Sequence, residues 1–71
     1  MKHKYDGSQI KQMREQLGLS QSQFAALINA NTATIQMWEQ GVSKPTTYTL
    51  FLLQEYVSAI LVKRYFNEEV M

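Results

Sequence analysis

Residues 19–41, LSQSQFAALINANTATIQMWEQG, carry the most informative pattern in the chain. The first half of this stretch predicts a short helix. Ser20 is a good N-cap, and Gln23 follows three residues later, which is the spacing of a capping box. The apolar residues of this helix are Phe24, Leu27 and Ile28, with Ala25 close by. Asn29 tolerates the left-handed conformation, so we expect the helix to end near Ile28.

The second half of the same stretch predicts another helix after a very short turn. Asn31 is placed to cap this helix, and Gly41 is placed to end it. Ile35 and Trp38 lie three residues apart, so they point to the same side. Two helices joined by a turn of about three residues, around Asn29–Asn31, have helix-turn-helix geometry.

A further helix is expected before this stretch. Asp6 is a suitable N-cap with Gln9 as its capping-box partner, and Gly18 is the expected left-handed stop. The apolar residues that repeat at helical spacing between them are Ile10, Met13 and Leu17. These side chains are expected to form one side of the core.

The segment from Thr46 to about Phe66 contains no helix-breaking residue and is rich in apolar side chains. They are Leu50, Phe51, Leu52, Leu53, Tyr56, Val57, Ile60, Leu61, Val62, Tyr65 and Phe66. So many apolar residues cover far more than one face of a helix. The pattern is compatible with one helix or with two separated by a bend, and we expect two. One face would complete the monomer core, and the rest, within residues 54–66, would hold a second copy of the chain.

The composition is that of one small globular domain over residues 1–71. The 71 residues carry a formal net charge of +1, and 45% of them are apolar. The expected helices make the fold class a small all-α domain of four or five helices. No apolar run approaches the roughly 20 residues of a membrane span, and residues 1–7 lack the apolar core of a signal peptide. We therefore expect a cytoplasmic protein.

Catalysis and metal binding find little support in the residue types present. There is no cysteine and the single histidine is His3, so we expect neither a thiolate nor a histidine metal site. Ser20 and Ser22 lie where helix caps and helix surfaces need small polar groups, and no glycine-rich phosphate loop occurs. We expect no enzymatic activity, no metal and no cofactor.

The helix-turn-helix stretch and its flanks resemble the lambda-repressor-like family, which includes Cro, CI and Xre proteins. The segments that carry the resemblance are Leu19–Ala25 and Ile35–Gly41. In the family's motif Gln21 is the first position and Gln40 the last. The matching inner positions are the small residue Ala25 and the apolar residues Ile28, Ile35 and Trp38. The departure is Asn29, where the family usually has glycine. The resemblance covers roughly residues 8–53 and implies a DNA-binding domain with its helix-turn-helix at residues 21–40.

The outward face of the helix after the turn is suited to reading DNA bases. Its residues, opposite the inward side chains of Ile35 and Trp38, are Thr32, Ala33, Gln36, Met37 and Gln40. Gln36 can bond an adenine edge bidentately, while Ala33 and Met37 can pack on thymine methyl groups. The alternative is a solvated helix face, which often carries glutamine and threonine. With the turn motif beside it, we expect this face to enter the major groove.

Contacts with the DNA backbone are expected on both sides of this helix, since phosphate contacts set the register of a protein on the duplex. The residues concerned are Gln21, Asn31, Ser43, Lys44 and Thr46. Lys44 has the alternative of being an ordinary solvated loop lysine. The resemblance also implies an ion pair between Arg14 and Glu39. We interpret this pair as structural, because it would lock the first helix to the recognition helix.

The resemblance implies a sequence-specific, dimeric transcriptional repressor of the kind found among phage Cro proteins. Two recognition helices about 34 Å apart would enter successive major grooves of a palindromic operator. The residues expected at the homodimer interface are Tyr56, Val57, Ile60, Lys63 and Arg64. Two alternatives remain open. One is the antitoxin of a toxin–antitoxin pair, with a toxin bound to the apolar C-terminal surface. The other is a protein-interaction module without DNA binding, which only the low net charge supports.

Overall fold

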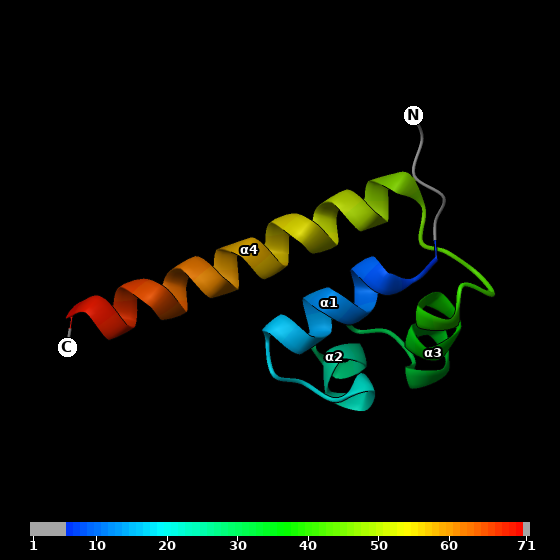
Figure 1. Cartoon of the computed structure of the whole chain (residues 1–71), viewed down its shortest axis with the longest axis horizontal. Coiled ribbons are helices and arrows are strands. Elements are labelled where there is room, and N and C mark those ends of the chain that lie inside the picture. Colours follow the sequence, from blue (N-terminus) through cyan, green and yellow to red (C-terminus); the bar gives the residue numbers. More distant parts are fainter. Residues whose placement is uncertain (1–5, 71) are drawn as a thin grey trace.

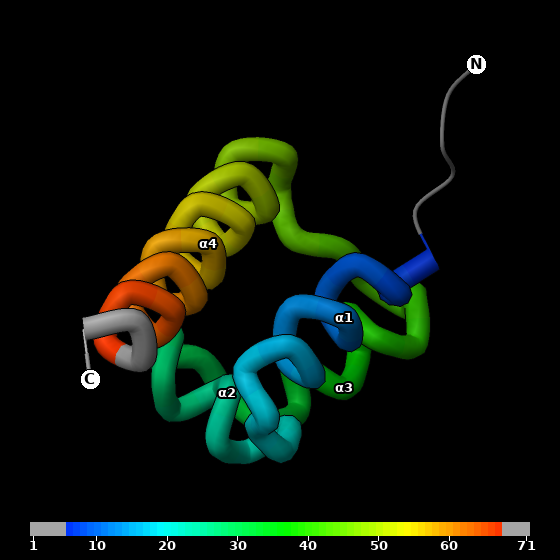
Figure 2. Tube along the Cα trace, turned by 60° about the vertical axis from the view of Figure 1, so that its left-hand side comes forward, coloured from blue at the N-terminus to red at the C-terminus, as the bar shows by residue number. Residues whose placement is uncertain are grey.

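Four helices account for most of residues 6–70, which are the residues that the computed structural model describes. They are α1 (Ser8–Gln16), α2 (Gln21–Leu27), α3 (Thr32–Gln40) and α4 (Thr47–Val70). The first three helices pack into one body, and α4 lies alongside α1 and then continues past that body (Figure 1 and Figure 2). The expected all-α fold is confirmed, and the described residues contain no strand. None of the four helices is long and apolar enough to cross a membrane.

The first three helices end in the same way, with one residue in the left-handed conformation. This residue is Gly18 (φ 72°) after α1, Asn29 (φ 58°) after α2 and Gly41 (φ 77°) after α3. The next amide then turns back to the helix, as where Ala30 N–H donates to the Ala25 carbonyl oxygen at 2.8 Å. This Schellman arrangement satisfies carbonyls that have no partner within the helix. The three expected helix ends are therefore confirmed, and the turn between α2 and α3 is short.

The starts of α2 and α3 differ in whether a side chain accepts a hydrogen bond from the first backbone N–H groups of the helix. Ser20 and Gln23 form the expected capping box, in which Ser20 Oγ accepts from Gln23 N–H at 3.1 Å and Gln23 Oε1 accepts from Ser20 N–H at 2.8 Å. Asn31 occupies the N-cap position of α3 but makes no side-chain cap hydrogen bond. The Asn31 side chain is exposed and is not used to hold the helix end.

The start of α1 corrects the expected cap at Asp6. The N-cap is Gly7, in the left-handed conformation with φ 88°. The Asp6 carboxylate lies just outside the helix, where it accepts from Ser8 N–H at 3.0 Å and from Ser8 Oγ at 2.8 Å. Gly7 is buried because it lies against the end of α3, and a Cβ there would overlap the carbonyl oxygens of Trp38 and Glu39. The left-handed turn therefore brings the start of α1 against the end of α3.

The core is a single cluster to which all four helices contribute. Its buried members are Ile10, Met13, Leu17, Phe24, Ala25, Ile35, Leu53 and Val57. The small residue Ala25 is only 2% exposed and lies in this core beside Phe24. Leu27, another apolar residue of α2, is 38% exposed, because α2 turns the side of Phe24 and Ala25 to the core. The buried side chains bring α3 onto α1 and α2 and fix the direction of its outer face.

The C-terminal segment is one helix, so the expected division into two is wrong. α4 spans 24 residues, about 36 Å at the helical rise, and runs to Val70. It contains neither glycine nor proline, and therefore nothing interrupts its backbone hydrogen bonds. Thr46 starts the helix, because its hydroxyl oxygen accepts from Thr49 N–H at 3.1 Å. Only Leu53 and Val57 of the described α4 side chains are buried, so most of its apolar residues stay outside the core.

Candidate nucleic-acid interface

The helix expected to read DNA presents an open, uncharged face. Ile35 is fully buried under α3, while Ala33, Gln36, Met37 and Gln40 are exposed and Thr32 is half-buried. The five residues expected to read bases therefore lie together on the outer side of α3. Their side chains offer amide donors and acceptors, one hydroxyl and two apolar groups. A surface of this kind can both hydrogen-bond base edges and contact thymine methyl groups.

An ion pair fixes α3 against α1. Arg14 Nε donates to Glu39 Oε2 at 2.7 Å, and Arg14 Nη2 donates to Glu39 Oε1 at 3.1 Å, which makes the pair bidentate. The Arg14 and Glu39 side chains are only 14% and 7% exposed. Arg14 also donates through Nη1 to the Leu19 carbonyl oxygen at 3.0 Å, so the same guanidinium holds the loop before α2. The pair therefore ties together α1, the α1–α2 loop and α3.

Gln21, at the first position of α2, belongs to the same network. Its Nε2 donates to Glu39 Oε1 at 3.1 Å, so this oxygen accepts from two side chains. Burial raises the pKa of Glu39, but the hydrogen bonds from Arg14 and Gln21 outweigh burial and hold it below the ordinary value of 4.5. The hydrogen bonds to Glu39 likewise raise the pKa of Arg14 above its usual range. Both groups are therefore charged at neutral pH and largely cancel each other.

Three other residues expected at the DNA backbone lie in the loop after α3. They differ in whether their side chains are already hydrogen-bonded within the chain. Ser43 and Lys44 are exposed in the loop between α3 and α4. Thr46 uses its hydroxyl as the cap of α4, and the same group donates to Thr49 Oγ1 at 2.9 Å. Its backbone directly precedes α4.

The residues expected at a dimer interface do not form one surface. Val57 is 3% exposed and belongs to the core of its own chain, so it is not available to a second copy. Ile60 packs against the same core, and Arg64 Nη1 donates to the Leu17 carbonyl oxygen at 3.2 Å. Tyr56 and Lys63 are exposed at the margin of this face. Val57, Ile60 and Arg64 share the inner side of α4 with Leu53, whereas the helical spacing turns Tyr56 and Lys63 away from Val57 by more than a quarter of a turn.

Sequence reasoning missed two features that hold the site in place. The close approach of Gly7 to α3 depends on how two helices pack and leaves no local signal except the glycine itself. The Arg64 contact joins α4 to the end of α1 across 47 positions of the chain. Neither feature is visible in the spacing of residues along one helix.

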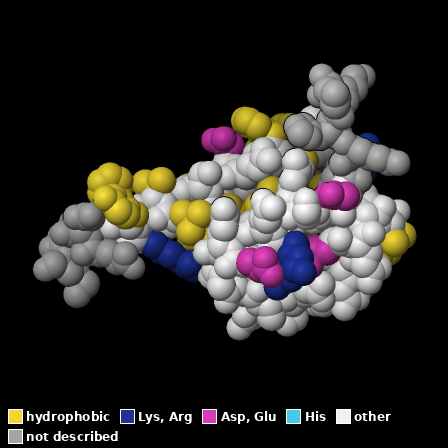
Figure 3. Space-filling view, viewed as in Figure 1, with side chains coloured by type: hydrophobic (Ala, Val, Ile, Leu, Met, Phe, Trp, Pro, Cys, Tyr) yellow, Lys and Arg dark blue, Asp and Glu magenta, His cyan; other side chains and the backbone are white. Residues whose placement is uncertain are grey.

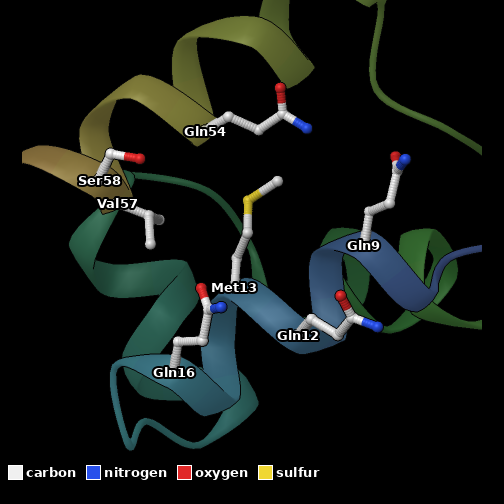
Figure 4. Close-up of a pocket in the computed structure, with 7 residues that line it drawn as sticks. All are labelled: Gln9, Gln12, Met13, Gln16, Gln54, Val57 and Ser58. Carbon is white, nitrogen blue, oxygen red and sulfur yellow. The ribbon is translucent and has the colours of Figure 1, made fainter. Parts of the chain in front are cut away.

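A groove of about 320 Å³ lies between α1 and α4, away from the outer face of α3 (Figure 4). It is lined by Gln9, Gln12, Met13, Gln16, Gln54, Val57 and Ser58. These side chains are uncharged, and the described part of the chain contains no group of three residues able to hold a metal ion. We interpret the groove as a gap between two loosely packed helices, because its lining contains no charged side chain.

Comparison with known families identifies the fold and its general function. A helix-turn-helix family model of the Cro/CI/Xre type matches residues 10–58, more than half of the chain. The chain belongs to the lambda-repressor-like helix-turn-helix family. No curated protein and no solved structure shows significant similarity to it. As a family member, the protein is a DNA-binding transcriptional regulator, and such domains are in general not enzymes. The family match ends at Ser58, so the last part of α4 lies beyond the matched region.

Proposed function

We propose that the protein is a transcriptional repressor of the Cro type, which binds a palindromic operator as a homodimer. The observation that supports this proposal best is the outer face of α3. Ala33, Gln36, Met37 and Gln40 are exposed there together, directly opposite the fully buried Ile35. In this proposal α3 lies in the major groove, and Gln36 bonds the edge of an adenine.

The surrounding residues position α3 on the duplex without reading sequence. Lys44 and Ser43 follow α3 and would contact a phosphate on one side, and Gln21 and Asn31 would approach the backbone on the other. Arg14 neutralises Glu39, so the carboxylate next to the reading face does not repel phosphates. The ion pair also sets the angle of α3 relative to α1, which determines the direction in which Gln36 points.

The low net charge of the chain supports a homodimer in this proposal. A formal net charge of +1 gives weak electrostatic attraction to DNA, which supplies most non-specific binding. Pairing two reading helices on one operator makes the second contact intramolecular and raises the affinity without new contacts. Repression would then result from occupancy of the operator, in the cytoplasm where the DNA lies.

The test is a pair of glutamine variants measured on the same operator. Gln36→Ala is expected to weaken binding by about 1–3 kcal/mol, with the loss concentrated at one base pair. Gln12→Ala removes the same side chain from the α1–α4 groove and is expected to leave binding unchanged. Equal affinities of the two variants for the operator and for its mutants would refute base reading by α3.

The exposed apolar side of α4 favours one second candidate. An antitoxin would use the same α3 face to regulate its own operon and would hold a toxin on α4. Co-expression with the product of the neighbouring gene distinguishes the two. A stable complex that masks α4 would favour the antitoxin, and an unbound homodimer would favour the repressor.

A further inference from the structure

α4 carries two apolar sides, of which the core uses one. Leu53 and Val57 are buried on the inner side. The opposite side carries a regular row of residues, which we call the outer stripe: Tyr48, Leu52, Glu55, Ala59, Val62 and Phe66. All six are exposed, and Tyr48, Val62 and Phe66 remain 71%, 53% and 59% exposed. Figure 3 shows hydrophobic side chains gathered where α4 leaves the body of the protein.

The spacing of the outer stripe is that of a coiled-coil seam. Its residues follow one another at intervals of four, three, four, three and four positions. This alternation keeps side chains on one side of a helix that pairs with another helix along its length. From Tyr48 to Phe66 the outer stripe is about 27 Å long at the helical rise. Four of its six members, Tyr48, Leu52, Val62 and Phe66, are large and apolar, and they share one side of the helix instead of being scattered singly over the surface.

The free end of α4 needs such a partner for its stability. Beyond Leu61 every described side chain of α4 is exposed, and this part of the helix projects past α1–α3 (Figure 1). In this part of the helix the Arg64 guanidinium donates to the Leu17 carbonyl oxygen at the end of α1, and the rings of the neighbouring Tyr65 and Phe66 contact each other edge to face, 5.7 Å apart, within α4 itself. Most helical stability in proteins comes from packing an apolar face, and here that face is still open.

We infer that the outer stripe of α4 pairs with the outer stripe of a second copy in an antiparallel two-helix interface. This inference rests on the proposed function, since it supplies the dimer that a palindromic operator requires. It also replaces the interface expected around Val57, Ile60 and Arg64, whose side chains are engaged within their own chain. The outer stripe includes no residue of α3, so the proposed dimer surface and the proposed DNA-binding surface share no side chain.

The direction of pairing follows from Glu55. A parallel pair would set each residue against itself and would place two Glu55 carboxylates together in the seam, which is destabilising. The intervals of four, three, four, three and four positions are the same in both directions along the helix. Each member of the outer stripe therefore lies opposite another member when two copies pair antiparallel. Tyr48 then meets Phe66 of the partner subunit, Leu52 meets Val62 of the partner subunit, and Glu55 meets the small Ala59 of the partner subunit. Lys63 of the partner subunit is one turn further on, where its ammonium group can reach the Glu55 carboxylate.

Matched valine variants test whether the outer stripe holds the second copy. Sedimentation equilibrium of the full chain is expected to show a dimer. Val62→Asp places a carboxylate in the apolar seam and is expected to raise the dimer dissociation constant at least about tenfold. Val42→Asp makes the same change at a valine that is 72% exposed in the loop after α3, and is expected to leave the constant unchanged. A monomeric parent chain, or equal constants for the two variants, would overturn the inference.

Cysteine variants test the direction independently of stability, since the chain has no cysteine of its own. Leu52→Cys and Val62→Cys are purified separately, mixed and oxidised. An antiparallel pair brings these two positions within the roughly 7 Å that a disulfide requires, while it separates identical positions by about 15 Å. We therefore expect the mixed disulfide between the two variants. Disulfides between identical variants would overturn the antiparallel direction, and no disulfide at all would overturn the interface.

A DNA titration separates failure of this inference from failure of the proposed function. Val62→Asp is expected to keep the base preference on a single half-site and to lose the affinity gained on the full palindrome. A parent chain that reads half-sites but does not pair through α4 would refute only the interface. A parent chain that pairs through α4 but has no base preference would refute only the repressor, and a parent chain that does neither would refute both.

Discussion

Arg14 and Glu39 show how one contact can determine the direction of a reading surface. The pair is bidentate and nearly buried, and Gln21 adds a third donor to the same carboxylate. Removing Glu39 would leave the Arg14 charge largely buried without its partner. The resulting loss of folding free energy is far larger than the net stabilisation that the intact pair provides. The network was expected from the resemblance, but the Leu19 carbonyl and Gln21 became visible as partners only in three dimensions.

Glu39→Ala is therefore expected to lower the free energy of unfolding by about 3 kcal/mol. Glu15→Ala removes an exposed carboxylate from the position next to Arg14 in α1 and is expected to change the free energy of unfolding by less than about 0.5 kcal/mol. Urea denaturation of both variants measures the difference. Similar losses in the two proteins would mean that the ion pair does not lock α3.

The lowered pKa of Glu39 predicts how this stability depends on pH. The folded chain holds the carboxyl below its ordinary value of 4.5, so between the two values the unfolded chain binds more protons. The contribution is therefore complete above about pH 4.5 and is lost as the pH falls through the folded-state value. Denaturation at a series of acid pH values should show this loss in the parent protein and a weaker pH dependence in Glu39→Gln. Identical pH profiles would contradict the assignment.

Two glycines test the packing of α1 on α3. Both Gly7 and Gly18 have positive φ, so an alanine at either is expected to cost about 1–2 kcal/mol of backbone strain. At Gly18 the added Cβ meets nothing within 4 Å, whereas at Gly7 it overlaps two backbone carbonyl oxygens of α3. Gly7→Ala is therefore expected to lower the melting temperature clearly more than Gly18→Ala. An equal drop would mean that α1 starts further from α3.

At the scale of helices, sequence reasoning succeeded where the chemistry is local. The Ser20–Gln23 capping box and the left-handed residues at positions 18, 29 and 41 act within a few residues, so their pattern locates α1, α2 and α3. It failed at Asp6, where the outcome depends on the contact of Gly7 with α3. It also failed in α4, where two helices were expected and one is found. The helix stays straight because nothing breaks it, and the surplus of apolar residues remains on its outer side.

Neighbouring leucines distinguish the two sides of α4. Leu53 is 7% exposed in the core, and Leu52 is 45% exposed on the outer stripe. Leu53→Ala is expected to cost about 2–5 kcal/mol of monomer stability. Leu52→Ala should change monomer stability little and instead raise the dimer dissociation constant. Denaturation at low protein concentration measures monomer stability, and sedimentation measures the dimer dissociation constant. If Leu52→Ala lost the monomer stability and Leu53→Ala the dimer, Leu52 and not Leu53 would face the core.

At the scale of the whole molecule, a nearly neutral chain presents an uncharged reading face beside a single loop lysine. In the proposed repressor, specificity would depend on hydrogen bonds and on the spacing of two copies more than on general attraction to DNA. The candidate site could be placed from sequence because the helix-turn-helix positions it. The proposed dimer surface could not be placed in the same way, because the inward direction of the Val57, Ile60 and Arg64 side chains depends on the packing of α4.

Lys44 provides the electrostatic prediction at this scale. Lys44→Ala is expected to weaken binding about equally on all sequences and to reduce the salt dependence by about one phosphate contact per subunit. Titrations of operator and unrelated duplexes at several salt concentrations measure this effect. A loss confined to the operator, with an unchanged salt slope, would contradict a phosphate contact at Lys44.

The most direct test of sequence-specific DNA binding is a selection from randomised duplexes by the folded full-length chain, at about physiological salt. We expect enrichment of a two-fold symmetric site with fixed half-site spacing, and the base preference at one pair of each half-site should disappear in Gln36→Ala. Absence of any enriched sequence, with the protein intact and folded, would contradict the assignment of α3 as a reading helix.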